Sequence, residues 1–401
     1  MTSRATEPTR LADPAAAVAA AQQLATPLAK RAADHDREGR FPAADFDDLR
    51  SAGLLGLMVP TRLGGPGAGF RDYAEVAMVL AAGNGSTALI FNMHASVTGA
   101  LAGTPDDLAR ALGVPESYFE MRDRVLAAAV DGSLYAVAMS ERGAGSRLSQ
   151  LTTSYEPVDG GYRIRGSKTF VSAAGHADGY LVAARRVDAD PAVLSHFIVP
   201  AGAGLRVEQT WDSLGMRATG SNELHIDATV PEDALLGGME GLVLLLAQVM
   251  PQWLVASYAA VYVGVAQSAI DAAAAHAGDR GLDRLPAVRA RIGRADAAVA
   301  AARLAVLEAA GRIDRAPGEP ETNRWVWRAK LLAGQTAMDV AASMLEAAGT
   351  SASRRGHPLE RIFRDARCGS LQPATSDVCA DWLGTAALGL DPENAAEVAR
   401  W

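Results

Sequence analysis

The hydrophobic pattern of the chain changes twice, and these changes constrain its fold more than any other feature. From about Leu134 to Leu236, short β-branched or aromatic runs alternate with turn signals, which is typical of strands joined by tight turns. Asp159-Gly160-Gly161 between two such runs indicates a β-hairpin. Long Ala- and Leu-rich segments precede and follow this block. We therefore predict three domains, a helical one over 1–132, a β-domain over 133–238 and a helical one over 239–401.

The helical segments carry recognisable start and stop signals. Asp13 precedes Pro14 at one expected helix start, and Gly53 follows the segment Pro42–Ala52 at another expected end. The N-terminal helices are expected over 14–33, 42–52, 73–82 and 87–102. The C-terminal helices are expected over 240–277, 285–314, 322–349 and 373–387.

Composition excludes several function classes. The 401 residues are 49% hydrophobic and 21% charged with a net charge of −8, which fits a globular protein and argues against nucleic-acid binding. Cys368 and Cys379 supply neither a disulfide framework nor a metal site, so a reduced, cytoplasmic location is expected. The most apolar stretch, Gly241–Val261, is interrupted by Pro251 and glutamines, which favours buried core helices over a membrane span.

One strand–turn pair has the chemistry of a ring-binding site. The apolar run Ala136–Gly145 enters a Gly-rich turn carrying Ser140, and about twenty residues later a second strand offers Phe170 and Ser172. Glycines let backbone N–H groups approach a ligand closely, and hydroxyls beside an aromatic suit a flat, polar-edged ring such as a flavin. An ordinary strand–turn is the alternative for either segment alone, whereas the pair together favours a ligand.

These segments resemble the flavin-binding middle domain of the acyl-CoA dehydrogenase family, whose pattern is roughly [ST]-E-x-x-[AG]-G-S-D followed by G-x-K-x-[WF]-[IV]-[ST]. Similar matches occur in the same order at Gly53–Gly65, Leu214–Ser221, Val230–Gly237 and Pro358–Asp365, so the resemblance covers nearly the whole chain. It implies an α+β multidomain fold. The parts would be an N-terminal all-α domain, a central β-barrel-like or β-sandwich domain, and a C-terminal four-helix bundle.

The resemblance implies that the flavin ring contacts the β-domain. The residues concerned are Met139, Ser140, Ser146, Phe170 and Ser172. Ser140 would contact the flavin edge through its backbone and hydroxyl, and Ser146 would lie near the diphosphate. Turn-capping is the alternative role for each serine. Arg147 stands where the family has an aspartate.

The resemblance also implies a second set of cofactor contacts from the C-terminal domain. Arg280 resembles an arginine that reaches across a subunit interface to the flavin diphosphate, although an exposed helix-end arginine is the alternative. Glu346, Gly349 and Thr350 fall where the family places a Gln and a Gly-Gly pair near the adenine half of FAD. FAD is therefore the implied cofactor, with FMN not excluded, in a homodimer or homotetramer.

The usual catalytic base is missing from the positions that the family uses. Family members remove the α-proton of an acyl thioester with a carboxylate while a hydride leaves to the flavin. The two positions that carry this glutamate are Pro373 and Leu254 here. Asp377, four residues beyond Pro373, is one candidate for a relocated base; a helix-capping or surface aspartate is the alternative.

Some flavin-dependent monooxygenases share the fold and lack the glutamate. They carry a histidine in the region of Asn92-Met93-His94 and a Ser or Thr in the F-x-S strand. His94, Phe170 and Ser172 match that pattern, whereas Gln372 stands where these enzymes have a second histidine. A packed core histidine is the alternative for His94.

Three hypotheses follow. The leading one is α,β-dehydrogenation of an acyl-CoA or acyl-carrier-protein thioester, with an electron-transfer flavoprotein or O₂ as acceptor. The second is oxygenation of a small substrate with reduced flavin and O₂. The third is a catalytically silent, flavin-free subunit, which the altered positions Arg147 and Glu346 keep open.

Overall fold

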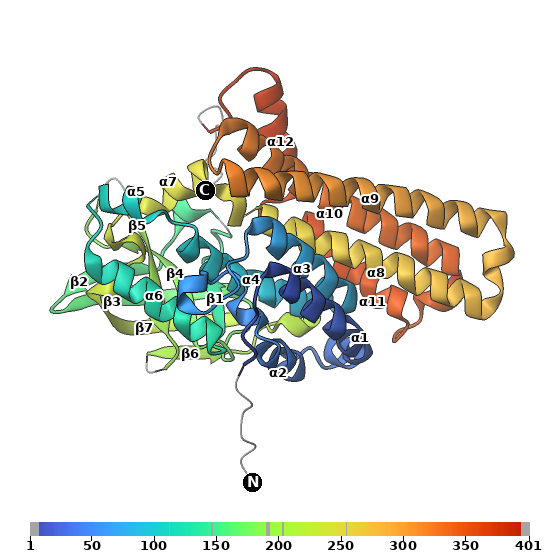
Figure 1. The fold of residues 1–401 in the computed structure, drawn as a ribbon, viewed down its shortest axis with the longest axis horizontal. Helices are drawn as coiled ribbons and strands as arrows, with labels where there is room; N and C mark the ends of the chain where they lie inside the picture. Colours follow the sequence, from blue (N-terminus) through green and yellow to red (C-terminus); the bar gives the residue numbers. More distant parts are fainter. Residues whose placement is uncertain are drawn as a thin grey trace, which may run out of the picture.

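The computed structural model describes residues 8–111, 113–145, 147–189, 193–202, 204–253 and 255–393. The sheet lies at one end of the molecule and a long helical bundle extends from the other, with helices α1 to α4 between them (Figure 1). This is the predicted fold class: a helical N-terminal domain, a curled central sheet and a C-terminal helical bundle.

The N-terminal helices begin and end at residues whose side chains or backbone explain the boundary. The Asp13 carboxylate accepts from the backbone N–H of Ala16 at 2.8 Å, so α1 starts where the sequence predicted. Asn84 ends α3 and caps α4 by accepting from the N–H of Ser86 at 3.1 Å. The helices are α1 Pro14–Glu38, α2 Ala43–Ser51, α3 Phe70–Gly83, α4 Gly85–Ala102, α5 Asp106–Ala111 and α6 Glu116–Val130.

Helix α4 is apolar on nearly all sides and is buried accordingly. It packs against α3, α6, α8 and strand β1, so it contacts all three parts of the molecule. A helix without a polar face is stable only where neighbours cover it completely. Groups on α4 are therefore held between the sheet and the bundle.

The central domain is one seven-stranded sheet. Its strands are β1 Tyr135–Ala138, β2 Ser154–Val158, β3 Gly161–Val171, β4 Gly179–Arg186, β5 Leu194–Pro200, β6 Leu205–Glu208 and β7 Asn222–Pro231. The main path runs β1-β4-β2-β3-β7-β6, and β5 pairs with β4. The predicted hairpin at Asp159–Gly161 is confirmed, since β2 and β3 pair antiparallel across this turn. Two strands expected separately at 162–164 and 169–172 form the single long strand β3.

The C-terminal part is helical to its end. Its helices are α7 Leu242–Val249, α8 Ala256–Arg280, α9 Pro286–Arg315, α10 Pro320–Ala348, α11 Pro358–Arg367 and α12 Ser376–Ala387. Helices α8 to α11 form the bundle. The expected single helix over 240–277 is divided into α7 and α8, and α11 was not among the expected helices. Short 3₁₀ helices complete the chain: η1 Leu54–Gly56, η2 Thr61–Leu63, η3 Leu148–Gln150, η4 Arg217–Thr219, η5 Glu232–Ala234, η6 Leu236–Gly238, η7 Pro251–Trp253, η8 Leu282–Arg284, η9 Thr350–Ser353 and η10 Cys368–Ser370.

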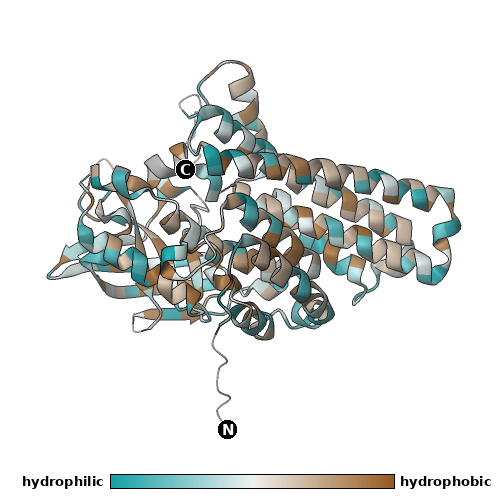
Figure 2. Ribbon diagram, in the orientation of Figure 1, coloured by the Kyte–Doolittle hydropathy of each residue, from teal (hydrophilic) through white to brown (hydrophobic). Residues whose placement is uncertain are grey.

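Helix α8 is the core helix of this part. Among the described residues, only the stretch Pro251–Arg280 is long and apolar enough to cross a membrane, and most of it is buried against α3, α9 and α10. A Cβ at Gly264 would lie 2.2 Å from the carbonyl oxygen of Met78, so α3 and α8 pack too closely for any other residue there. The outer helices mix apolar and polar residues, and the turn at the remote end of the bundle is hydrophilic (Figure 2).

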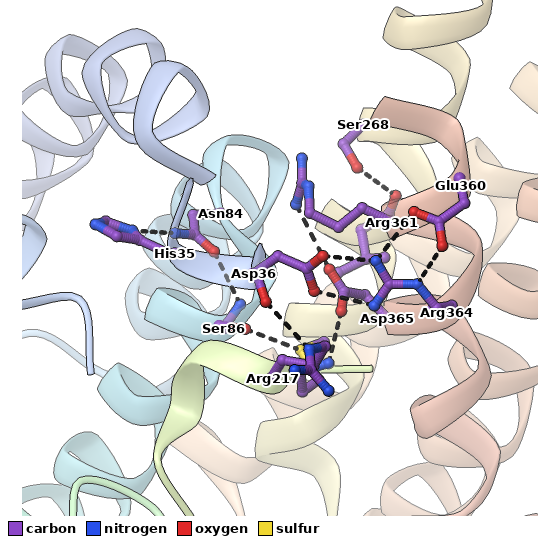
Figure 3. Close-up of polar contacts among 12 residues, drawn as sticks. His35, Asp36, Asn84, Ser86, Arg217, Ser268, Glu360, Arg361, Arg364 and Asp365 are labelled. Carbon is purple, nitrogen blue, oxygen red and sulfur yellow. Dashed lines mark hydrogen bonds and ion pairs between the residues drawn. The ribbon is translucent and has the colours of Figure 1, made fainter. Parts of the chain in front are cut away.

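An ionic cluster joins the three parts of the molecule (Figure 3). Arg364 on α11 donates to both carboxylate oxygens of Asp36 on α1 at 2.6 and 3.0 Å, to Glu360, and to the carbonyl oxygen of Leu214 in the β-domain. The neighbouring Asp365 accepts from the backbone N–H of Met216 at 2.6 Å. Arg364 and Asp365 are neighbours in sequence but bind different partners, and together they connect α1, the β-domain and α11.

Candidate functional site

A buried ion pair shapes the Gly-rich turn after β1. Lys168 on β3 donates to Glu141 at 2.7 Å, and both side chains are at most 3% exposed. Glu141 also accepts from the backbone N–H groups of Thr152 and Thr153 at 2.7 and 3.0 Å. Burial opposes ionisation, but the Lys168 charge and these hydrogen bonds lower the pKa of Glu141 to about 2. Glu141 therefore stays ionised, and its ion pair and hydrogen bonds fix the turn.

The same ion pair draws the two predicted flavin segments together. The Lys168 ammonium donates to the carbonyl oxygen of Met139 at 3.2 Å, and the N–H of Thr169 donates to the carbonyl oxygen of Ser140 at 2.9 Å. The end of β1 and the end of β3 thus lie side by side. Ser146 lies outside the described residues.

Phe170 is displayed at an irregularity in β3. The pairing with β7 shifts register between Lys168 and Val171, and Phe170 takes a φ of 57° with its side chain 61% exposed. A bulky residue in this backbone region costs about 1–3 kcal/mol, which usually indicates a functional constraint. The Trp211 ring contacts Phe170 edge-on, with centroids 6.0 Å apart. The exposed Phe170 ring and the half-buried Trp211 ring together form an aromatic surface beside the turn.

The turn and its surroundings fit a flavin ring. A Cβ added at Gly143 or Gly145 would meet nothing within 4 Å, so this backbone faces open space. Within the described part of the chain the Ser140 hydroxyl makes no hydrogen bond, and it is free to bind a ligand. Bare backbone, a free hydroxyl and a displayed aromatic ring are what a flat, polar-edged cofactor requires. Ser172 is different, because its buried hydroxyl bonds to that of Ser221 at 3.0 Å.

The second set of predicted cofactor residues lies elsewhere in the chain. Arg280 ends α8, and Glu346, Gly349 and Thr350 close α10 and begin η9, at the end of the bundle remote from the sheet (Figure 1). Glu346 forms an ion pair with Arg291 at 2.6 Å and is largely exposed. A single chain therefore does not bring these four residues to the Gly-rich turn.

His94 has no free ring nitrogen for catalysis. Its Nε2 lies 2.7 Å from the carbonyl oxygen of Leu55, and its Nδ1 accepts from the N–H of Tyr135 at 3.0 Å. The side chain is 1% exposed, and burial lowers its pKa to about 4. The geometry therefore supports the alternative stated for His94: it is a neutral core residue that joins η1 to β1. His94 is therefore not proposed as a catalytic residue.

Replacing His94 with Gln is expected to change the pH dependence of stability. The folded-state pKa lies below the ordinary value of 6.5, so the wild type loses up to about 3 kcal/mol as the pH falls from 6.5 to 4. Burial raises the pKa of Asp365 to about 6, which gives the opposite slope between about pH 4 and 6, but this contribution is common to both proteins. Urea denaturation across this range measures the difference; equal slopes in wild type and variant would contradict the assignment.

The segment after α11 lies where the family base is expected, and it contains no carboxylate. It runs from Cys368 to Thr375 and includes Gln372 and Pro373. Gln372 accepts from the Tyr262 hydroxyl at 2.7 Å. Asp377 is exposed in the first turn of α12, where Thr375 caps the helix. Leu254, the other family position, lies outside the described residues.

A buried lysine fixes this segment. Lys330 on α10 is 1% exposed and donates to the carbonyl oxygens of Gly369, Gln372 and Ala374 at 2.8, 3.2 and 2.9 Å. Burial lowers its pKa to about 8. Neither Lys330 nor Trp211 was predicted from the sequence. Lys330 closely follows Arg328 in a helical segment, so its charge alone does not mark it as buried, and nothing in the sequence distinguishes Trp211.

The fold and the turn define a flavoenzyme, and comparisons with known proteins agree. Sequence models of the acyl-CoA dehydrogenase N-terminal, middle and C-terminal domains match residues 15–112, 136–229 and 256–375. The chain belongs to the acyl-CoA dehydrogenase family, and it is a flavin-dependent oxidoreductase.

Its relatives within the family carry out different reactions. L-evernosamine nitrososynthase of a Micromonospora species is 33% identical over 92% of this chain and 88% of its own length. A putative acyl-CoA dehydrogenase of Bacillus subtilis is 29% identical over 88% and 92%, and dibenzothiophene monooxygenase of Rhodococcus qingshengii is 28% identical over 91% of each chain. The FMN-bound TdsC structure from Paenibacillus sp. A11-2 has a TM-score of 0.80 and 26% identity, covering 93% of this chain and 97% of that one.

Proposed function

We propose that the protein is a flavin-dependent monooxygenase that oxidises a nitrogen or sulfur atom of a small substrate with O₂. The observation that carries this proposal is the segment 368–375, which has no carboxylate and which Lys330 holds in place. Proton abstraction from an acyl thioester needs such a group beside the flavin. The similarity to a nitrososynthase and a dibenzothiophene monooxygenase supports the same conclusion.

The chain's own residues would bind and orient the reactants. Bound reduced flavin would supply the two electrons with which one oxygen atom enters the substrate and the other leaves as water. Ser140 and the bare turn at Gly143 and Gly145 would hold the ring edge, and Phe170 with Trp211 would keep water from one side.

We propose FMN as the cofactor, with a second copy of the chain completing the site. Glu346 stands where the family places a Gln near adenine; its carboxylate can only accept hydrogen bonds, and it pairs with Arg291 at 2.6 Å, so it offers no donor to an adenine ring. Arg280 lies too far from the turn of its own chain, which favours a homo-oligomer in which the partner supplies it. Heat release of the bound cofactor followed by chromatography identifies it; FAD would contradict this part.

Labelled oxygen gives the direct test of the oxygenation proposal. The purified holoprotein, a flavin reductase with NADH as electron donor, and ¹⁸O₂ are combined with a panel of amino sugars and aromatic sulfides. We expect one labelled atom in a product from one of these classes. NADH consumption yielding only hydrogen peroxide with every substrate would contradict the substrate class, and a colourless protein that takes up no flavin would support the silent-subunit hypothesis.

Dehydrogenation of an acyl thioester is the second candidate function, and the role of Asp377 distinguishes it from oxygenation. The similarity to a putative acyl-CoA dehydrogenase favours this reading, with Asp377 as a relocated base. Asp377 is exposed in the first turn of a helix. We therefore expect Asp377→Asn to change the turnover number for the enzyme's substrate by no more than about twofold. Asp296→Asn, at an exposed site on α9, is the matched control. A loss of about a hundredfold or more confined to Asp377→Asn would restore the dehydrogenase assignment.

A further inference from the structure

A cavity lies away from the Gly-rich turn, where α1, α8 and α11 meet. Its volume is about 670 Å³, and its walls include Ser268, Arg217, Arg355, His357 and Arg361. None of the residues predicted to bind the flavin lines it. Cavities of this size commonly take small-molecule ligands.

The carboxylates that line this cavity already have partners. Asp36 and Glu360 both bind Arg364, each through two hydrogen bonds of 3.1 Å or less (Figure 3). Asp271 accepts from the Gln267 side chain at 2.9 Å. Arg364 therefore offsets the charges of Asp36 and Glu360, and these two carboxylates are not free to pair with Arg355 or Arg361.

Arg361 is the cation without an adequate partner. Its side chain is 13% exposed, and its one ion pair is a 3.5 Å contact with Asp365. Its buried Nε has no hydrogen-bond partner in the described part of the chain. A guanidinium has five N–H donors in a planar fork, and burying it with one loose contact is unfavourable. Within the same described residues Arg355 forms no ion pair.

We infer that this cavity binds the phosphate or diphosphate group of a small soluble molecule. Guanidinium groups bind phosphate oxygens in pairs, and an anion here would accept from the terminal N–H groups of the loosely paired Arg361 and meet the charges of Arg355 and Arg217. The ligand would touch all three domains, because α1, η4 and α11 each contribute to the wall. This inference does not depend on which reaction the flavin site performs.

The test uses flavin-loaded protein, so that the cofactor site is filled, and inorganic pyrophosphate as the probe. Calorimetric titration at constant ionic strength is expected to show saturable binding that is at least about tenfold weaker in Arg361→Met and partly retained in Arg361→Lys. Arg294→Met, an exposed arginine of α9, is the control and should bind as the wild type does. Thermal unfolding verifies that each variant is folded; if Arg361→Met is not, the exposed Arg355→Met serves, with weaker binding again expected.

Three outcomes would overturn the inference. The first is no saturable binding at millimolar pyrophosphate, and the second is equal affinity in the wild type and every arginine variant, which would mean an adventitious ion only. The third is release of the flavin by pyrophosphate, which would make the cavity part of the cofactor site rather than a separate one.

Discussion

Lys168→Met is expected to destabilise the protein by about 3–5 kcal/mol and to abolish flavin retention. The substitution leaves the Glu141 carboxylate buried without its counter-ion, and removing one partner of a buried pair costs far more than the pair itself contributes. It also removes the donor to the Met139 carbonyl, which holds β1 against β3. Denaturant unfolding and flavin absorbance after gel filtration measure the two effects.

The double variant Glu141→Gln with Lys168→Met provides the control for this prediction. Because it removes both charges, it should recover part of the lost stability but not the flavin affinity. Arg328→Met breaks an ion pair with Glu321 that is more than a third exposed on both sides, and it should change stability little. A loss below about 1 kcal/mol for Lys168→Met would mean that the pair does not fix the turn.

Arg364→Leu is expected to have a second large effect, also about 3–5 kcal/mol. Asp36 and Glu360 would then face each other without the cation that separates them, and the connection from α11 to Leu214 would be lost. We expect the N-terminal helices to separate more easily from the bundle. Denaturant unfolding gives the loss, and limited proteolysis should show earlier cleavage between the domains.

Removing the charges of Asp36 and Glu360 tests whether unpaired carboxylates cause the destabilisation. If the destabilisation comes from unpaired carboxylates, Asp36→Asn with Glu360→Gln in the Arg364→Leu background should restore much of it. Arg10→Met, which breaks an exposed pair with Asp131 that also spans distant segments, should leave unfolding nearly unchanged. Equal losses in Arg364→Leu and Arg10→Met would refute the special role of the cluster.

The fold was predictable because it depends on patterns that are local in the sequence. Period-two runs and turn residues placed the sheet, and Asp13 and Pro14 placed the start of α1. The two motif segments that carry Ser140 and Phe170 meet in the fold, because the N–H of Thr169 donates to the carbonyl oxygen of Ser140. Helix α11 was not predicted because its segment was treated only as part of a motif, although Leu359, Ile362 and Ala366 recur at helical spacing and are buried.

The details of the site were less predictable because they depend on contacts between distant residues. Lys330 meets carbonyl groups about forty residues away, and only the folded chain shows that these close around its ammonium. The sequence marks His94 as a candidate, but it does not show that Leu55 and Tyr135 occupy both ring nitrogens. The strained backbone of Phe170 is likewise a tertiary feature.

Pro373 and Leu254 stand at the two positions where the family carries its carboxylate base, so we expect no thioester dehydrogenation. The most direct test is an anaerobic titration of the oxidised holoprotein with acyl-CoA and acyl-carrier-protein thioesters of varied chain length, followed by flavin absorbance. We predict that the absorbance stays unchanged with every thioester. Bleaching of the flavin by any one of them would contradict the account.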